Sequence, residues 1–106
     1  MLKEQIEYGI SFLLFGDNNN RATVEMDQYG KFVITVDLHG CSVRQAKKII
    51  NGIIALIREP FTFAIIHGYI HGMAIKEYIH NEFCNTRVVE KYCFSHNPGE
   101  TFLTVN

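Results

Sequence analysis

The chain twice runs from a short apolar stretch through a histidine–glycine turn into a helix-like pattern. The first turn is Val36-Asp37-Leu38-His39-Gly40, and the second is Ile66-His67-Gly68-Tyr69-Ile70-His71-Gly72. A glycine after each stretch lets the backbone turn sharply, because glycine adopts positive φ angles without strain. Two such turns on parallel strands would bring their polar side chains to one edge of a sheet, where α/β proteins usually build their sites. The repeat therefore predicts an α/β domain with a candidate site at that edge.

The segment between the two turns carries clear helix signals. Ser42-Val43-Arg44-Gln45 matches a capping box, in which the serine and glutamine side chains bond the backbone at the helix start. Glu59-Pro60 ends this helix, because proline disfavours helical geometry in the residue before it. Phe61–Ile66 is a continuous apolar run, typical of a strand that is covered on both sides or central in a parallel pair. Apolar residues recur along the helix every three or four positions, as expected for one buried face: Val43, Ala46, Ile50, Ile53, Ile54 and Ile57.

A second helix and two strands follow the second turn. The helix should begin near Gly72 or Met73 and end at Asn85 or Thr86, with a buried stripe formed by Ile75, Tyr78, Ile79 and Phe83. Arg87–Phe94 and Thr101–Val105 read as antiparallel strands, joined by a turn at Ser95–Gly99 that Pro98-Gly99 signals. Strand–helix–strand crossovers are right-handed, so both helices should pack on one face of the sheet. Residues 31–106 thus predict a two-layer α/β sandwich of β-α-β-α-β-β order with a four-stranded mixed sheet.

Residues 1–30 read as an N-terminal appendage of helix and strand rather than an independent domain. Apolar residues at helical spacing predict a short helix within residues 2–15: Ile6, Ile10, Leu13 and Leu14. Asp17–Asn20 favours a loop, since Asn and Asp side chains bond their own backbone locally. Ala22–Met26 and Lys31–Leu38 flank a turn at Asp27–Gly30 and predict a hairpin.

Composition narrows the class of protein. The chain has 106 residues, of which 47% are hydrophobic and 20% charged, as expected for one globular domain. There is no apolar run of about 18 residues, which predicts no membrane-spanning helix, and acidic residues near the N-terminus argue against a signal peptide. The cysteines have no metal-binding spacing, which favours reduced thiols in a cytosolic protein: Cys41, Cys84 and Cys93.

Charge is uneven along the chain. Residues 1–30 carry five acidic and two basic residues, whereas residues 31–106 carry eight basic and six acidic residues. The net charge of −1 gives a weak electrostatic attraction to phosphate. Binding to nucleic acid is therefore neither excluded nor required by the composition.

The two turns resemble the signature motifs of the Smr (small MutS-related) domain family. The resemblance rests on Asp37-Leu38-His39-Gly40 and on His67-Gly68 followed by Gly72, and it covers about residues 34–106. The usual second motif is His-Gly-x-Gly, and Ile70 stands where its second glycine is expected. The form found here, followed by Lys76, is similar to a variant of short standalone members. The resemblance implies an endonuclease that nicks DNA or cleaves RNA.

The chemistry of such a cleavage points to Asp37, His39 and His67 as catalytic residues. A phosphodiester cleavage requires an activated nucleophile, a proton donor for the leaving oxygen and stabilisation of the added charge. Histidine suits both proton roles near neutral pH. Our hypothesis is that His39 and His67 supply these roles and that Asp37 orients one imidazole. The alternatives are a turn or helix-cap role for Asp37 and, for His67, a bond to a neighbouring backbone carbonyl.

The starts of the two predicted helices are candidate phosphate-binding sites, because free N–H groups and a partial positive charge lie there. Basic side chains near a helix start oppose the helix dipole, and a phosphate partner would account for them. The alternative is an ordinary solvated helix face. The candidate nucleic-acid or phosphate contacts are Gly40, Arg44, Gly68, Gly72 and Lys76. Next to the first turn, Cys41 reads as a small buried thiol.

Other interpretations remain open at this point. A carboxylate and imidazoles make an acceptable divalent-metal site, and the candidate ligands are Asp37, His39, His67 and His71. His71 reads more simply as a solvated loop residue, and His80 and His96 read as surface residues. The alternative function is a non-catalytic nucleic-acid-binding or phosphate-binding module, which the weak charge and Ile70 favour. The sequence leaves open the choice between DNA and RNA and whether the chain forms a homo-oligomer.

Overall fold

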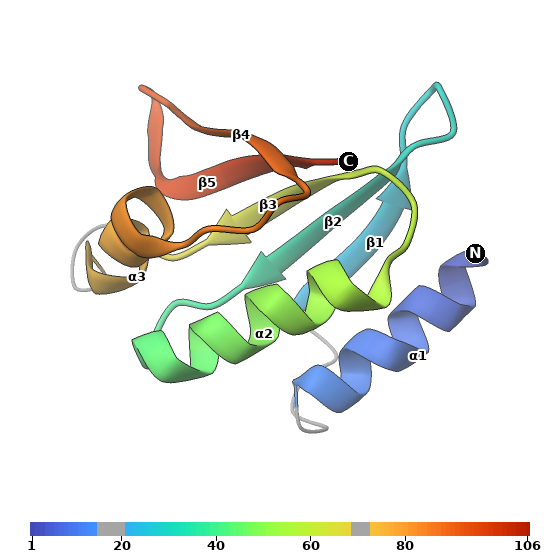
Figure 1. Ribbon diagram of the computed structural model, residues 1–106, viewed down its shortest axis with the longest axis horizontal. Coiled ribbons are helices and arrows are strands. Elements are labelled where there is room, and N and C mark those ends of the chain that lie inside the picture. The colour runs from blue at the N-terminus through green and yellow to red at the C-terminus, as the bar shows by residue number, and fades with distance from the viewer. Residues whose placement is uncertain (15–20, 69–72) are drawn as a thin grey trace.

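The computed structural model describes residues 1–14, 21–68 and 73–106. Within these ranges no helix is long and apolar enough to cross a membrane. Figure 1 shows helices packed against a twisted sheet. The elements in chain order are α1 (Lys3–Leu13), β1 (Ala22–Met26), β2 (Phe32–Asp37), α2 (Val43–Leu56), β3 (Phe61–Ile66), α3 (Met73–Glu77), the π-helical turn η1 (Tyr78–Glu82), β4 (Val88–Phe94) and β5 (Asn97–Val105).

The sheet has five strands in the order β1-β2-β3-β5-β4. β2 and β3 are parallel, and the other neighbouring pairs are antiparallel. The predicted hairpin forms, with β1 paired to β2 from Ala22 opposite Val36 to Met26 opposite Phe32. However, β1 extends the main sheet as its edge strand, so the prediction of a four-stranded sheet is wrong. The α/β class and the element order from residue 31 onward are as predicted.

One face of the sheet carries the hydrophobic core. Alternate residues of β2 are buried, as period-2 strand geometry requires when one face is covered: Phe32, Ile34 and Val36. α1, α2 and α3 lie over this face (Figure 1), and their buried residues join the same cluster. α1 crosses α2 closely, because a Cβ built on Gly9 would lie 2.6 Å from Leu56, and one on Gly52 would lie 2.7 Å from Leu13. The N-terminal helix therefore packs on the main domain through glycine contacts.

The opposite face of the sheet carries an aromatic cluster. The rings of Tyr92 and Phe102 are stacked with centroids 5.5 Å apart, and Phe94 meets Phe102 edge-on at 5.3 Å. Tyr92 and Phe94 are exposed. With the helices on one face only, the domain has the predicted two layers.

The second predicted helix differs from expectation in its last turn. The predicted stripe from Ile75 to Phe83 is buried, but regular α-helix stops at Glu77 and the π-helical turn η1 follows. The N–H of Phe83 bonds the carbonyl of Tyr78, five residues earlier, at 2.8 Å. The two aromatic rings meet edge-on at 6.1 Å. The wider turn thus keeps both side chains in the core, and the predicted end at Asn85 or Thr86 is wrong.

The connection between β4 and β5 is shorter than predicted. Asn97 already pairs with Phe94, so Pro98-Gly99 lies inside β5 and not in a turn. The Gly99 carbonyl accepts hydrogen bonds from the backbone N–H groups of His67 and Gly68, at 2.9 and 3.0 Å. These bonds hold Pro98-Gly99 extended beside the second histidine turn, which explains why a turn-forming dipeptide does not turn here.

Candidate functional site

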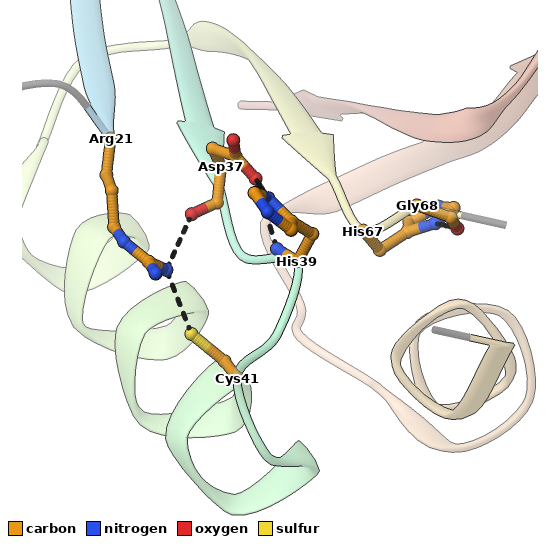
Figure 2. Close-up of polar contacts among 6 residues, drawn as sticks. All are labelled: Arg21, Asp37, His39, Cys41, His67 and Gly68. Carbon is orange, nitrogen blue, oxygen red and sulfur yellow. Dashed lines mark hydrogen bonds and ion pairs between the residues drawn. The ribbon is translucent and has the colours of Figure 1, made fainter. Parts of the chain in front are cut away.

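The two histidine turns lie side by side at the carboxyl ends of β2 and β3. Asp37 and Ile66 are paired in register at the ends of these strands, and the Leu38 N–H bonds the Ile66 carbonyl at 2.8 Å. A Cβ built on Gly68 would lie 3.8 Å from the Cβ of His39. Figure 2 shows this edge of the sheet with its polar side chains. The structure thus brings together two turns that are nearly 30 residues apart in sequence.

Asp37 and His39 form a hydrogen-bonded pair in the first turn. The Asp37 Oδ1 atom lies 2.6 Å from the His39 Nδ1 atom and also accepts the backbone N–H of His39 at 3.1 Å. A carboxylate can only accept, so Nδ1 carries the proton and Nε2 of the neutral ring is an acceptor. The His39 side chain is 67% exposed, against 31% for Asp37. Asp37 therefore acts as a turn residue and also orients an imidazole whose reactive nitrogen is accessible.

Arg21, the residue before β1, supports this turn, and no sequence motif indicated it. Its Nη1 atom donates to the Asp37 carbonyl at 3.3 Å and contacts the Cys41 Sγ atom at 3.3 Å (Figure 2). Cys41 is half-buried beneath it rather than fully buried as expected. The hairpin register places residue 21 beside Asp37, since the Asp37 N–H bonds the Arg21 carbonyl. The register of the predicted hairpin was the sequence signal that could have located Arg21 beside the turn. Arg21 contacts both ends of the turn, at Asp37 and Cys41.

His67 occupies a very different environment from His39. It is fully buried, with Nδ1 2.8 Å from the Gly68 carbonyl and Nε2 2.8 Å from the Thr101 hydroxyl. Burial lowers the pKa of His67 most, and the positive charge of Lys76 lowers it further, against the opposing effects of the Gly68 carbonyl and Glu100. This is the backbone-bonded geometry that was the alternative for His67. The neutral imidazole holds the second turn against β5.

His80 is half-buried and bonded, so its expected surface position is wrong. Its Nε2 atom lies 3.0 Å from the Thr101 hydroxyl, and the Cys93 Sγ atom lies 3.3 Å from the same hydroxyl. Burial, then the charges of Lys76, His67 and Lys91, lower the pKa of His80. His96 is exposed as expected and stacks on Phe94.

The lowered pKa values predict a pH-dependent stability. Below about pH 6.5, the ordinary histidine pKa, the unfolded chain binds protons that folded His67 and His80 do not bind. The free energy of unfolding should therefore be highest above this pH and fall as the pH decreases, by at most about 1.4 kcal/mol per pH unit for each histidine. Urea unfolding at a series of pH values measures this dependence.

Two variants serve as test and control for the pH dependence. The variant H67Q should flatten the dependence, whereas replacement of the exposed His96 by Gln should leave it unchanged. An H67Q chain with the full dependence of the parent would show that His67 does not cause it.

The remaining candidate residues surround the two turns. Gly40 and Gly68 have φ angles of +82° and +77°, which other residues rarely adopt. Arg44 is exposed in the first turn of α2. The predicted capping box of Ser42 and Gln45, which lie on either side of Arg44 in the sequence, is present. Lys76 is half-buried in α3, near enough to His67 and His80 to affect both. Three positions of the second turn fall outside the described residues: Ile70, His71 and Gly72.

The geometry does not support the metal-site alternative among the described residues. There, no group of three or more His, Cys, Asp or Glu side chains is placed to hold a metal ion. Both ring nitrogens of His67 are already bonded to protein groups. The pair formed by Asp37 and His39 is instead suited to proton transfer.

No comparison with known proteins assigns a family to this chain. The resemblance to the Smr domain depends on the motifs around His39 and His67 and on the order of the elements. It is therefore a hypothesis about this chain. The chain matches no protein-family model, no curated protein and no solved structure.

Proposed function

We propose that this chain is an Smr-type endonuclease that cleaves phosphodiester bonds of nucleic acid at the pair Asp37–His39. The observation that carries the proposal is the 2.6 Å contact between the Asp37 carboxylate and Nδ1 of an imidazole that is 67% exposed. An imidazole held in this way presents Nε2 to a substrate in the tautomer that accepts a proton. This is the requirement for a general base near neutral pH.

His39 would act twice in one cleavage. It first accepts a proton from the attacking oxygen, which is water for DNA or a ribose 2′-hydroxyl for RNA, as a new P–O bond forms. The imidazolium is stabilised by the adjacent Asp37 carboxylate. It then returns the proton to the leaving oxygen as the scissile P–O bond breaks. One oriented histidine thus supplies both proton transfers.

Positive and backbone groups beside the pair would bind the phosphate. Gly40 and Gly68 have no side chain, so a phosphate backbone can approach both turns closely. The exposed guanidinium of Arg44 and the N–H groups at the start of α2 favour negative charge. Lys76 adds a positive charge on the side of the second turn. These groups would stabilise the charge that develops on the phosphoryl oxygens.

His67 has a positioning role in this proposal. Its imidazole is fully buried and bonded at both nitrogens, so it does not reach a substrate from the surface. Its bonds fix the second turn beside His39. From its position in the motif, His67 was instead predicted to exchange protons with the substrate directly.

The variant Asp37→Asn tests the proposal. The amide keeps the size of the side chain but removes the charge that stabilises the imidazolium, so the cleavage rate should fall about a hundred-fold. Cleavage of end-labelled single-stranded RNA and nicking of supercoiled plasmid measure this rate and identify the substrate. A chelator added to both assays tests for a required metal ion.

A matched control is available in the turn between β1 and β2. The Asp27 carboxylate accepts the N–H groups of Tyr29 and Lys31, much as Asp37 accepts that of His39. The variant D27N should leave cleavage unchanged. Equal rates for D37N and the parent would refute the proposed role of the pair. Binding of either nucleic acid without cleavage by the parent would assign the chain to the alternative, a non-catalytic binding module.

A further inference from the structure

Side chains from separate elements converge on the hydroxyl of Thr101 in β5. The Thr101 side chain is fully buried. Its Oγ1 atom lies 2.8 Å from His67 Nε2, 3.0 Å from His80 Nε2 and 3.3 Å from Cys93 Sγ. The Cys93 Sγ and His80 Nε2 atoms are 3.5 Å apart. We call these four side chains the Thr101 cluster.

The protons in this cluster can be assigned from the bonding partners. The Gly68 carbonyl only accepts, so His67 carries its proton on Nδ1 and leaves Nε2 as an acceptor. The single proton of the Thr101 hydroxyl is therefore donated to His67. The Thr101 oxygen can then only accept from its other neighbours. It follows that His80 presents an N–H at Nε2 and that the Cys93 thiol donates to Thr101.

This arrangement gives the Cys93 proton a path to a base. The thiol proton can pass to Thr101 Oγ1 as the hydroxyl proton passes to His67 Nε2. Burial lowers the pKa of His67, so the ring is neutral and its Nε2 atom can accept, and the transferred proton is held only while Sγ carries a negative charge. The resulting thiolate would face the N–H of His80 at 3.5 Å. An imidazole linked to a thiol in this way is a recurrent means of activating a cysteine.

Two lysine side chains lie near the cluster. Lys76 and Lys91 are both close enough to lower the pKa of His80. The Lys91 ammonium is fixed by the carbonyls of Ile79 and Phe83, at the end of η1.

Cys93 differs from the other two cysteines in its surroundings. Cys93 is partly exposed and lies in an irregularity of β4 between Tyr92 and Phe94. The chain offers a natural comparison, because Cys84 is exposed and has no imidazole contact among the described residues. The third thiol, Cys41, contacts the guanidinium of Arg21.

We propose that Cys93 is a nucleophilic thiol, activated by His67 through Thr101, and a site of oxidation by small peroxides. In the reaction with hydrogen peroxide, Sγ attacks one oxygen, so an S–O bond forms as the O–O bond breaks. The proton held on His67 returns through Thr101 to the leaving hydroxide, which departs as water. The sulfur is oxidised to a sulfenic acid and the peroxide is reduced.

Two single-cysteine chains test the reactivity of Cys93. One carries Cys41→Ser with Cys84→Ser, and the other carries Cys41→Ser with Cys93→Ser. Each is treated with hydrogen peroxide at neutral pH, the sulfenic acid is trapped with dimedone, and intact mass gives the rate. Cys93 should react about ten-fold faster than Cys84, or more, because a positioned base assists its deprotonation. A rate no higher than that of Cys84 would overturn the proposal.

Changes at Thr101 test the proton path in the chain that retains Cys93. Thr101→Val keeps the shape but removes the hydroxyl, and it should reduce the rate to that of Cys84. Thr101→Ser keeps the hydroxyl and should retain most of the rate. Equal rates for T101V and its parent would show that no path through Thr101 exists.

A second variant covers the case in which T101V does not fold, as judged by circular dichroism. His80→Phe removes the N–H that faces the thiolate from a half-buried position. It should slow the reaction several-fold. An unchanged rate in H80F would overturn the assigned role of the cluster.

Discussion

Replacing His39 by glutamine should lower the rate of nucleic-acid cleavage about a thousand-fold, since general acid–base catalysis contributes on this scale. Glutamine keeps a polar side chain of similar reach but cannot accept and return a proton near neutral pH. The imidazole is 67% exposed, and its one described side-chain partner is Asp37, so the free energy of unfolding should change by less than about 0.5 kcal/mol. Cleavage kinetics and urea unfolding of the same preparation separate the two effects.

The variant H96Q is the matched control for H39Q. His96 is also exposed and lies on the β4–β5 connection, stacked on Phe94. The H96Q variant should cleave nucleic acid at the parental rate. Cleavage that survives H39Q would show that the activity belongs to another site or to a contaminating nuclease. The variant H67Q should instead lose stability and cleavage together, because the buried His67 side chain makes the hydrogen bonds that fix the second turn.

The position of the candidate site was predictable because it depends on local patterns. An apolar run followed by His39-Gly40 or His67-Gly68 marks the end of a strand, and the structure has a strand end at both places. Both glycines have positive φ angles, as their place in a sharp turn suggested. The strand ends and the glycine turns require only neighbouring residues and the geometry of a strand. The register that places Asp37 opposite Ile66 is a finding of the structure.

The supporting residues were not predictable in the same way, because their contacts join distant segments. The bond between His67 and Thr101 spans 34 positions, and no spacing in the sequence relates them. His80 read as a surface residue, because a lone polar residue on a helix gives no sign of a partner on another strand. The π-helical turn was also missed, since apolar positions three and four apart predict regular helix up to Phe83. Side-chain partners of this kind appear only once the strands are placed.

Arg87 is a further residue that the sequence did not single out, and it joins separate parts of the fold. Its guanidinium donates to the Ile54 carbonyl at 2.5 Å, to the Glu59 carbonyl at 3.2 Å and to the Asn106 carbonyl at 2.7 Å. Ile54 lies in the last turn of α2, where backbone carbonyls lack partners within the helix. Glu59 lies in the connection from α2 to β3. The Arg87 side chain therefore bonds a carbonyl at the end of α2 and links the start of β4 to α2 and to the connection between α2 and β3.

Arg87→Met should lower the free energy of unfolding by about 3 to 4 kcal/mol, because hydrogen bonds to a charged group contribute about 1.5–3 kcal/mol each and the bonds to the Ile54 and Glu59 carbonyls are partly buried. Methionine retains much of the apolar stem, so the loss reports the hydrogen bonds and not the packing. Arg58→Met is the control, since Arg58 is exposed and has no hydrogen bond among the described residues. It should change stability by less than about 0.5 kcal/mol. Equal urea midpoints for the two variants would show that the carbonyls around Arg87 find water when the guanidinium is removed, and that α2 does not depend on this side chain for its end.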